Sequence, residues 1–370
     1  MGVDEDVVAW RRHLHRNPEV SFAEHETSAW IAGMLTSFGL AVERPTPTSV
    51  LARLGAGPPV VALRADIDAL PIQEESGVEF ASERPGVMHA CGHDGHTAML
   101  LGAARTLAER GLERGEVRFI FQHAEELAPG GARELVEAGV MEGVGFVYGC
   151  HLWTPLAYGR VAAVPGPFMA AADFFTLTLT GKGGHGGLPH TATDLIAAAA
   201  ELVGSLQHIV SRRIDPLQPA VVSVGSLHAG DAPNVLPGEA VLRGTTRSFD
   251  PGVRARLPTL IEEITRGVCA AHGADFELDY QFGYRPVVND PGATELVRSV
   301  VDAELFDLAP IMGGDDFSAF AAEAPACYAF VGAGGEFPHH HPRFWIDERA
   351  LAIGTRLHVD VALRALEVYT

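Results

Sequence analysis

Three apolar runs, each with the length and composition of a buried β-strand, lead into residues whose side chains bind metals or transfer protons. The runs cover residues 60–63, 115–122 and 145–150, and the polar residues that follow them are Asp66 and Asp68, Glu125 and Glu126, and His151. Acidic residues at the end of a buried strand commonly belong to a site in α/β folds. The pattern therefore predicts an α/β domain with a site at its strand ends, although Asp66 and Asp68 would serve equally well to cap a turn.

The adjacent carboxylates Glu125 and Glu126 are predicted to have different roles. Neighbouring residues of a strand point in opposite directions, so one carboxylate on a metal and the other on a water molecule is the natural arrangement. A solvated acidic loop is the alternative, but a buried charge has to be paired or bound to a metal. A single histidine at position 151 would normally be structural. As the third candidate at a strand end, His151 is interpreted as a ligand.

Residues 88–97 hold three histidines, a cysteine and an aspartate. Turn-forming residues precede this stretch and an apolar helical pattern begins near residue 98, so a loop entering a helix is predicted. Cys91 and His93 are two positions apart, and both side chains can point into one space if the loop is extended. A thiolate and an imidazole suit zinc and similar transition metals. The alternative is a histidine-rich surface loop with a buried structural cysteine.

The composition excludes several classes of protein. A formal net charge of -20 argues against nucleic-acid binding, which requires basic patches. The four cysteines are widely scattered, which is no disulfide framework and fits the reducing cytoplasm. Neither a signal peptide nor an apolar stretch long enough to span a membrane is expected. These features favour a cytoplasmic protein without nucleic-acid or membrane partners.

The hydrophobic pattern changes at residue 173, after which large apolar residues alternate with threonines as in a half-exposed strand. Residues 172–285 predict the element order βαββαβ, which is that of a ferredoxin-like α+β domain. We therefore expect an inserted domain at 172–285. The remaining segments, 1–171 and 286–370, are expected to form one mixed-sheet α/β domain that carries the site.

Two segments outside the strand ends also carry histidines. Residues 181–187 include five glycines and His185, so this loop can approach a ligand closely but has little rigidity of its own. A histidine on such a loop is more often exposed than catalytic. Three consecutive histidines at residues 339–341 either supply a further ligand to the same site or are a solvated accident.

These motifs together resemble the M20 metallopeptidase family, and in particular its amidohydrolase branch. That branch includes hippurate hydrolases, N-acyl-amino-acid amidohydrolases and plant auxin-conjugate hydrolases. The resemblance covers nearly the whole chain and is carried by residues 11–24, 64–71, 89–94, 125–126, 151, 181–190, 234–237 and 340–342. The cysteine-containing motif is specific to this branch, since several other M20 branches have histidine and aspartate instead.

The resemblance implies a metallohydrolase catalytic domain whose site holds two divalent metal ions, with zinc, manganese, cobalt and nickel as candidates. The implied ligands are Cys91, His93, Glu126, His151 and His340. A His-x-Pro-x-Phe pattern selects His340 among the three C-terminal histidines. Glu125 is implied as the base.

Two residues depart from the family's pattern. Asp315 stands where the family often has glutamate, which puts the support at the far side of the site in doubt. His123 stands where the family often has proline, and this substitution is expected to place an additional imidazole near the catalytic carboxylate.

The implied reaction is hydrolysis of the amide bond of N-acyl amino acids such as N-acetyl or N-benzoyl compounds, with a dipeptidase or carboxypeptidase as the alternative. A metal-activated water attacks the carbonyl, and Glu125 takes its proton and passes it to the leaving amine.

The inserted domain is implied to act as a lid and as the dimer surface of a homodimer. The partner subunit's His185 is implied as an oxyanion donor, with Asn234 assisting it. Arg247 is a candidate for binding the substrate carboxylate, because arginine pairs with carboxylates through two parallel hydrogen bonds. An arginine on the exposed face of a strand is at least as good an interpretation of Arg247.

Two interpretations from other classes stay open. Cys91 beside His93 and Asp94 would suit the nucleophile of a cysteine hydrolase. A chelator would then leave activity intact, and a thiol alkylator would abolish activity without releasing metal. Alternatively, the chain is a non-catalytic metal-binding or metabolite-binding module, which predicts bound metal without turnover. This interpretation gives no role to Glu125 beside Glu126.

Overall fold

The computed structural model describes residues 2–369 and separates into two compact units. The first unit contains Met1–Phe168, Val287–Ala309 and Asp316–Thr370, and the second contains Met169–Pro286 and Pro310–Asp315. The terminal residues Met1 and Thr370, which belong to the expected segments 1–171 and 286–370, lie outside the described part of the chain.

The second unit includes a short segment that the sequence pattern did not assign to it, residues 310–315. The N–H of Ala170 donates hydrogen bonds to the carbonyls of Ile311, at 3.1 Å, and Gly313, at 2.8 Å. Met169 and Ile311 also form a parallel β-bridge. These backbone contacts attach the segment to the unit that contains the expected insertion.

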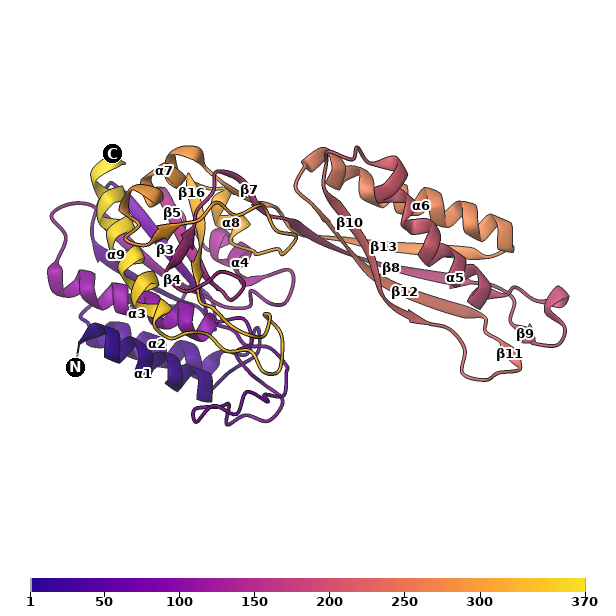
Figure 1. The fold of residues 1–370 in the computed structure, drawn as a ribbon, viewed down its shortest axis with the longest axis horizontal. Coiled ribbons are helices and arrows are strands. Elements are labelled where there is room, and N and C mark those ends of the chain that lie inside the picture. Colours follow the sequence, from indigo (N-terminus) through magenta and orange to yellow (C-terminus); the bar gives the residue numbers. More distant parts are fainter. Residues whose placement is uncertain (1, 370) are drawn as a thin grey trace. The chain divides into compact units, whose positions relative to one another are not determined.

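The first unit is built on an eight-stranded mixed sheet with the order β1-β2-β4-β3-β5-β16-β6-β15. Figure 1 labels its central strands β3, β4, β5 and β16. Its strands are β1 (Ala41–Glu43), β2 (Val50–Gly55), β3 (Val60–Asp66), β4 (Glu116–Gln122), β5 (Val144–Trp153), β6 (Arg160–Ala162), β15 (Glu304–Leu305) and β16 (Ala326–Gly332). The central strands β4, β3, β5 and β16 run parallel to one another, whereas β2 and β6 on either side of them pair antiparallel. Their carboxyl ends therefore reach the same edge of the sheet.

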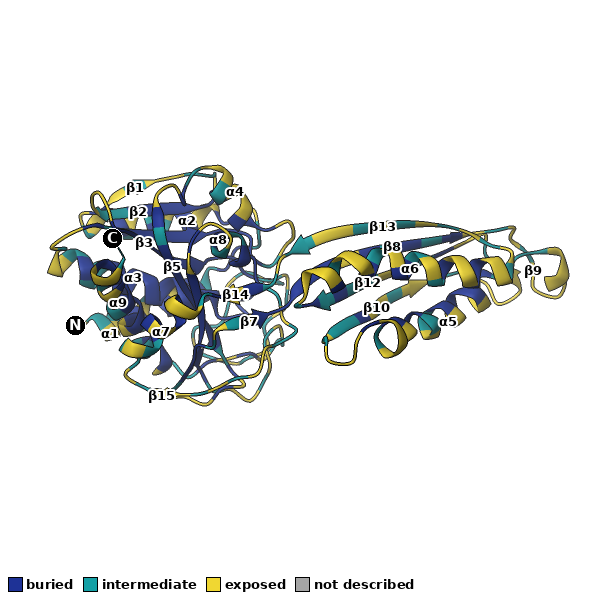
Figure 2. Ribbon diagram, turned by 90° about the horizontal axis from the view of Figure 1, so that it is seen from above, coloured by how far each residue is buried: buried dark blue, intermediate teal, exposed yellow. Residues whose placement is uncertain are grey.

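Helices cover this sheet, and a small second sheet pairs β7 (Gly166–Met169) with β14 (Val287–Asn289). The helices of the first unit are α1 (Val3–Arg16), α2 (His25–Ser37), α3 (His93–Arg110), α4 (Gly131–Glu137), α7 (Pro291–Val300), α8 (Ser318–Ala321) and α9 (Ala350–Val368). Figure 2 shows the central strands as buried, while exposed residues lie on the outer faces of the helices.

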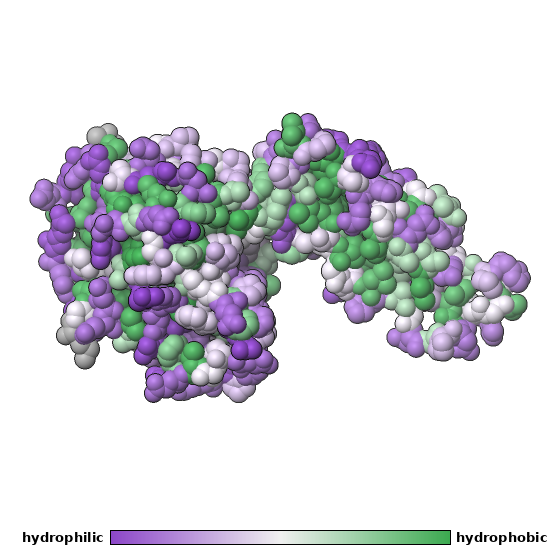
Figure 3. Space-filling view, viewed as in Figure 1, coloured by the Kyte–Doolittle hydropathy of each residue, from purple (hydrophilic) through white to green (hydrophobic). Residues whose placement is uncertain are grey.

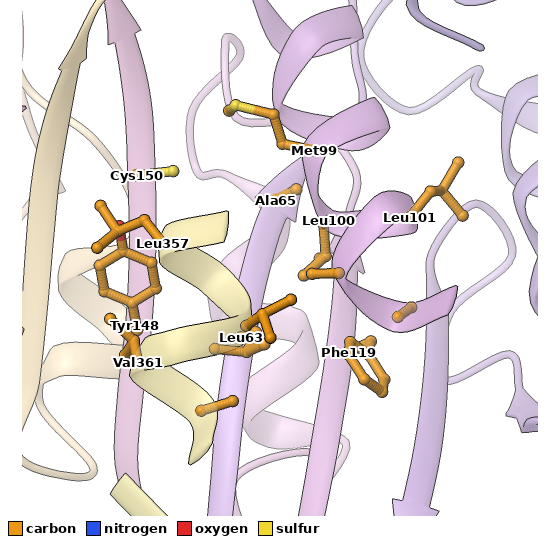
Figure 4. Close-up of a cluster of buried hydrophobic side chains, with 14 of the residues drawn as sticks. Leu63, Ala65, Met99, Leu100, Leu101, Phe119, Tyr148, Cys150, Leu357 and Val361 are labelled. Carbon is orange, nitrogen blue, oxygen red and sulfur yellow. The ribbon is translucent and has the colours of Figure 1, made fainter. Parts of the chain in front are cut away.

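The hydrophobic core lies between the sheet and the helices α3 and α9 (Figure 4). The sheet contributes Leu63 of β3 and Phe119 of β4 to this core, and the helices contribute Leu100 of α3 and Val361 of α9. All four side chains are fully buried. Burying one side chain of this size stabilises the fold by roughly 1.5–3 kcal/mol.

Close packing of α3 between two other helices depends on Gly102. A Cβ atom at this position would lie 2.6 Å from Cγ2 of Val7 in α1 and 2.8 Å from Cγ2 of Thr355 in α9. Because α3 also carries His93 at its first turn, the packing that fixes this helix also fixes one of the predicted ligands.

The second unit has the predicted order βαββαβ. Its antiparallel sheet has the order β10-β12-β8-β13, and its elements are β8 (Ala171–Thr180), β9 (Gly184–His185), η1 (Pro189–Thr191), α5 (Leu195–Leu206), η2 (Ile209–Arg213), β10 (Ala220–His228), β11 (Val235–Leu236), β12 (Glu239–Ser248), α6 (Pro251–His272) and β13 (Asp275–Tyr284). The helices α5 and α6 cover one face of this sheet and enclose a separate hydrophobic core.

No helix within residues 2–369 has the length and apolar character that a membrane crossing requires.

Candidate metal centre

The strand ends of the first unit carry the predicted site. Asp66 ends β3, Glu125 and Glu126 lie just beyond β4, and His151 lies near the end of β5. These three strands are parallel neighbours, so residues far apart in the sequence reach one edge of the sheet. All of residues 88–97 are buried as well, so the alternative of a histidine-rich surface loop is wrong.

The helix that follows Cys91 begins earlier than the sequence pattern predicted. It starts at His93 instead of near residue 98, and Gly92 immediately before it has a left-handed φ of 95°. Glycine adopts this conformation at little cost because it has no Cβ. The thiol of Cys91 and the ring of His93 are therefore brought together by a turn into the helix, and not by the extended loop that we expected.

The five expected ligands and Glu125 converge. Their potential ligand atoms form three overlapping groups, each within 4.8 Å: Cys91, His93 and His151; Cys91, Glu126 and His340; and His93, Glu125 and Glu126. The Sγ atom of Cys91 lies 3.4 Å from Nε2 of His151. Oε1 of Glu126 lies 3.2 Å from Nε2 of His340 and 3.9 Å from Nε2 of His93.

Two buried atoms in this cluster indicate that a cation fits it. Nε2 of His93 and Oε1 of Glu126 have no hydrogen-bond partner among the described residues. A buried polar atom without a partner is costly. The nitrogen, oxygen and sulfur donors gathered here are those that borderline transition metals prefer. The side chains therefore fit a site for such ions.

The electrostatics of the cluster point the same way. Burial would lower the pKa of His93, but the carboxylates of Asp66 and Asp68 next to it raise that pKa to about 10. Burial raises the pKa of the Cys91 thiol well above its usual value, and the carboxylates of Glu126 and Glu125 raise it further. The cluster carries excess negative charge that a divalent cation would balance.

Asp68 connects the ligands to the rest of the fold. The Nδ1 atom of His93 lies 2.9 Å from the carbonyl oxygen of Asp68 and 3.2 Å from its Oδ1. The other carboxylate oxygen, Oδ2, accepts the N–H of Glu126 at 3.0 Å and the hydroxyl of Ser21 at 2.7 Å. Because Nδ1 of His93 donates to these oxygens, Nε2 is left as the ring atom that would bind a metal.

Asp66 lies next to the cluster as well, with its Oδ2 3.7 Å from Nε2 of His93. Its Oδ1 lies 2.6 Å from Nδ1 of His96, and its Oδ2 accepts from Arg64 at 2.8 Å. Nε2 of His96 accepts the N–H of Leu152 at 2.8 Å, so both ring nitrogens of His96 are occupied. Asp66 and Asp68 thus belong to the surroundings of the site, and the alternative that they merely cap a turn is wrong.

Only one of the three consecutive histidines enters the cluster. His340 has a left-handed φ of 65°, and its N–H donates to the carbonyl of Ala90 at 2.8 Å, one residue before Cys91. His339 instead donates through Nε2 to the carbonyl of Leu152 at 3.0 Å. His341 stacks on Phe337 with 4.7 Å between ring centroids.

One group near the site was not anticipated from the sequence. Asp94, the residue after His93, accepts from Nε of Arg11 at 2.6 Å, and its Oδ2 lies 2.8 Å from Nδ1 of His15. Burial would raise the pKa of Asp94, but Arg11 and His15 lower it well below its usual value. The four-residue spacing of Arg11 and His15 on an amphipathic helix was the available signal for a shared partner.

Both residues that depart from the family pattern, His123 and Asp315, are buried. His123 is buried, and its ring contacts Glu134, with 3.1 Å from Nε2 to Oε2, and the edge of Phe22. These contacts anchor the loop after β4. Next to Asp315, Asp316 accepts hydrogen bonds from Arg64 at 3.0 Å and Gln122 at 2.8 Å, and so supports the strand ends of β3 and β4.

The remaining predicted residues lie in the second unit. His185 of β9 is exposed, and its Nδ1 accepts the N–H of Gly187 at 2.9 Å. The carbonyl of Asn234 accepts the N–H of Gly186 at 2.8 Å, so Asn234 and His185 belong to one small two-stranded structure. Arg247 of β12 is half-buried, and its guanidinium lies 5.9 Å from the centroid of the Phe174 ring.

Comparison with known proteins agrees with the fold. Residues 62–364 match the model of Peptidase family M20/M25/M40, and the chain belongs to this family. An N-acyl-L-amino acid amidohydrolase of Geobacillus stearothermophilus is 57% identical over 291 residues, which cover 78% of this chain and 79% of the relative. Thermostable carboxypeptidase 2 of Saccharolobus solfataricus is 39% identical over 376 residues, covering 98% and 96% of the two chains.

A solved structure is similar over nearly the whole chain. The crystal structure of the Bacillus subtilis YXEP protein, described as a dinuclear metal-binding peptidase of family M20, has a TM-score of 0.86 and 34% sequence identity. The match covers 99% of each chain. The resemblance to the M20 family and the predicted fold class are thereby confirmed.

Proposed function

We propose that the protein hydrolyses the amide bond of N-acyl amino acids, such as N-acetyl or N-benzoyl compounds, in a metal-dependent reaction. The observation that carries this proposal is the cluster of cysteine, histidine and glutamate side chains, which is largely buried apart from the exposed His340, with Glu125 beside the ligand atoms. The 57% identity to an N-acyl-L-amino acid amidohydrolase supports this substrate class. The alternative is a dipeptidase or carboxypeptidase, because a carboxypeptidase is 39% identical over nearly the whole chain.

The proposed centre holds two divalent metal ions, with zinc, manganese, cobalt and nickel as the candidates. Its ligands are Cys91, His93, Glu126, His151 and His340. When bound, such ions supply Lewis acidity that polarises the substrate carbonyl and makes water a better nucleophile near neutral pH. The orphaned Nε2 of His93 and Oε1 of Glu126 support this assignment, since binding a cation would satisfy both.

In the proposed reaction, Glu125 acts as the general base. Its carboxylate accepts a proton from water as the water oxygen attacks the carbonyl carbon of the amide. Glu125 then delivers this proton to the amide nitrogen, and the C–N bond breaks to give a carboxylic acid and the free amine of the amino acid. The second proton of the water passes from the carboxylic acid to this amine, so the products are a carboxylate and an ammonium group. Asp68 supports the reaction by holding the backbone N–H of Glu126 and the ring of His93.

We further propose that the second unit acts as lid and dimer surface of a homodimer. In that assembly, the partner subunit's His185, with Asn234, donates hydrogen bonds to the carbonyl oxygen as negative charge develops there. Arg247 is proposed to bind the substrate carboxylate. Exposed apolar side chains on this unit, including Leu188, Leu217 and Phe282, support an interaction surface, and Figure 3 shows apolar residues among polar ones on its visible face.

The proposed location is the cytoplasm. All four cysteines, Cys91, Cys150, Cys269 and Cys327, are free and buried, which suits a reducing compartment.

A substrate panel tests the proposed activity. Protein stripped of metal and then loaded separately with zinc, manganese, cobalt or nickel is given N-acetyl amino acids, N-benzoyl amino acids and dipeptides, and amine release is measured. We expect the N-acyl amino acids to be the best substrates and chelation to stop turnover. Activity that survives chelation but is lost on alkylating Cys91 would instead support the cysteine-nucleophile interpretation, and bound metal without any turnover would support a binding module.

A further inference from the structure

The backbone around the site has an unusual feature. Among the described residues, the non-glycine residues with left-handed φ are Phe22 at 65°, Ala124 at 50° and His340 at 65°. Residues with a Cβ rarely adopt this conformation, and they do so where surrounding contacts hold them in it. Ala124 directly precedes Glu125, so its conformation determines the direction in which the proposed base leaves the strand.

A buried carboxylate from a distant segment holds Ala124. Glu24 is fully buried, and its Oε1 accepts the N–H of Ala124 at 2.8 Å. On the other side of Glu125, Oδ2 of Asp68 accepts the N–H of Glu126 at 3.0 Å. The backbone N–H groups that flank the proposed base are therefore both held by carboxylates from outside the loop.

The segment that contains Glu24 is itself fixed to the site. Val20 forms a parallel bridge with Ala69, and the hydroxyl of Ser21 donates to Asp68 at 2.7 Å. The ring of Phe22 packs edge-on against His123, with 5.6 Å between the ring centroids. Glu24 therefore reaches Ala124 from a rigid support.

We propose that Glu24 is a positioning residue, which keeps Ala124 in its left-handed conformation by accepting its N–H and thereby aims the carboxylate of Glu125 at the reacting water. This inference rests on the proposed function, in which Glu125 is the general base. It assigns to Glu24 a role that depends on the reach of its side chain and not on its charge.

The surroundings of Glu24 agree with a role that does not require charge. Its Oε2 has no hydrogen-bond partner in the described part of the chain. Burial, and to a lesser extent the negative charge of Asp68, raise the pKa of Glu24 to about 7, although hydrogen bonds from the backbone and from the Thr48 side chain act in the opposite direction. Both the neutral acid and the carboxylate keep an oxygen that can accept the N–H of Ala124.

Two substitutions separate reach from charge. Glu24→Gln keeps the side-chain length and an acceptor oxygen but removes the charge, whereas Glu24→Asp keeps the charge and withdraws the oxygen by one methylene. We expect Glu24→Gln to retain kcat within about twofold. Glu24→Asp and Glu24→Ala should lower kcat by about 10- to 100-fold with KM and metal content close to wild type, since a displacement of about 1 Å at a reacting group can cost that much.

Glu19 provides a matched control from the same segment. It is also a buried carboxylate that accepts a backbone N–H, that of Thr27 at 2.7 Å, but this bond supports the start of α2 and not the loop of Glu125. Glu19→Ala should lower the thermal midpoint and leave kcat near wild type. If Glu24→Ala does not fold, the comparison of Glu24→Gln with Glu24→Asp still decides the question.

The inference would be overturned by wild-type kcat in Glu24→Asp, by a larger loss in Glu24→Gln than in Glu24→Asp, or by equal losses of kcat in Glu19→Ala and Glu24→Ala. Loss of metal in parallel with kcat would overturn it as well. The variant Glu125→Gln distinguishes this failure from failure of the proposed function. If Glu125→Gln is active, the assignment of Glu125 as general base is wrong, and the proposed function fails with it. If Glu125→Gln is inactive but metal-loaded and Glu24→Asp is active, only the positioning role of Glu24 is wrong.

Discussion

Replacing the two adjacent carboxylates one at a time separates the general base from the metal ligand. Glutamine in place of Glu125 has nearly the same shape, and the flanking hydrogen bonds to Ala124 and Glu126 do not involve its side chain. The amide cannot accept a proton from water, however. Loss of a general base typically lowers the rate by ~10²–10⁴, which corresponds to about 2.7–5.4 kcal/mol of activation free energy. Metal content should stay near wild type.

Glu126→Gln should have the opposite signature. Oε1 of Glu126 lies 3.2 Å from Nε2 of His340 and 3.9 Å from Nε2 of His93. A neutral amide at this position therefore replaces the proposed anionic ligand that lies between the two proposed histidine ligands. We expect lower metal occupancy, with turnover partly restored by excess metal in the assay. Metal analysis of both purified variants, together with kcat at rising metal concentration, makes the comparison. Equal loss of metal in the two variants, or an active Glu125→Gln, would refute the assignment.

Three further predictions concern the lid, the support of α3 and the metal. His185→Ala should lower kcat by ~10²–10³ with unchanged metal content, and mixing Glu125→Gln subunits with His185→Ala subunits should restore activity; verified hybrid dimers without activity would contradict a shared site. Asp94→Asn should lower the free energy of unfolding by about 1–3 kcal/mol at pH 7, because the buried Arg11 then keeps only Glu348 as a carboxylate partner. Since the folded pKa of Asp94 is depressed, this contribution is present above the unfolded value and fades as pH falls through the acid range, so denaturant titrations should show a smaller difference at pH 3. Chelation should lower the thermal midpoint, and metal at about 100 times its Kd should restore about 2.7 kcal/mol; a midpoint that does not respond to metal would show that the cluster binds none.

Features with a local sequence signal could be predicted, and those that depend on distant contacts could not. The strands before Glu125 and His151 have apolar runs of their own, and the period-2 pattern after residue 173 marks the change of domain. The early start of α3 depends on a left-handed Gly92, which no local pattern required. Attachment of residues 310–315 to the second unit depends on hydrogen bonds to Ala170.

The roles of Asp66 and Asp68 could not be decided from the sequence for the same reason. Capping a turn and supporting a site require the same residue type at the same position. The difference is made by partners such as His96 for Asp66, and Ser21 for Asp68, which the fold brings together from other elements. Glu24 had no signal at all, since its partner, the N–H of Ala124, belongs to a backbone conformation that only the folded chain reveals.

The arrangement of charge around the cluster is consistent with different roles for the neighbouring residues Glu126, the proposed ligand, and Glu125, the proposed base. Asp66 is paired with Arg64 and His96, so its charge is balanced by the fold itself. Glu126 has an orphaned oxygen beside ligand atoms, so its charge is left for a cation to balance. A buried charge of the second kind is costly in the absence of the cation. Metal binding and folding of the loop after β4 should therefore be coupled. Glu125 is positioned by the hydrogen bonds of the backbone N–H groups of Ala124 and Glu126, and its carboxylate remains available to exchange a proton.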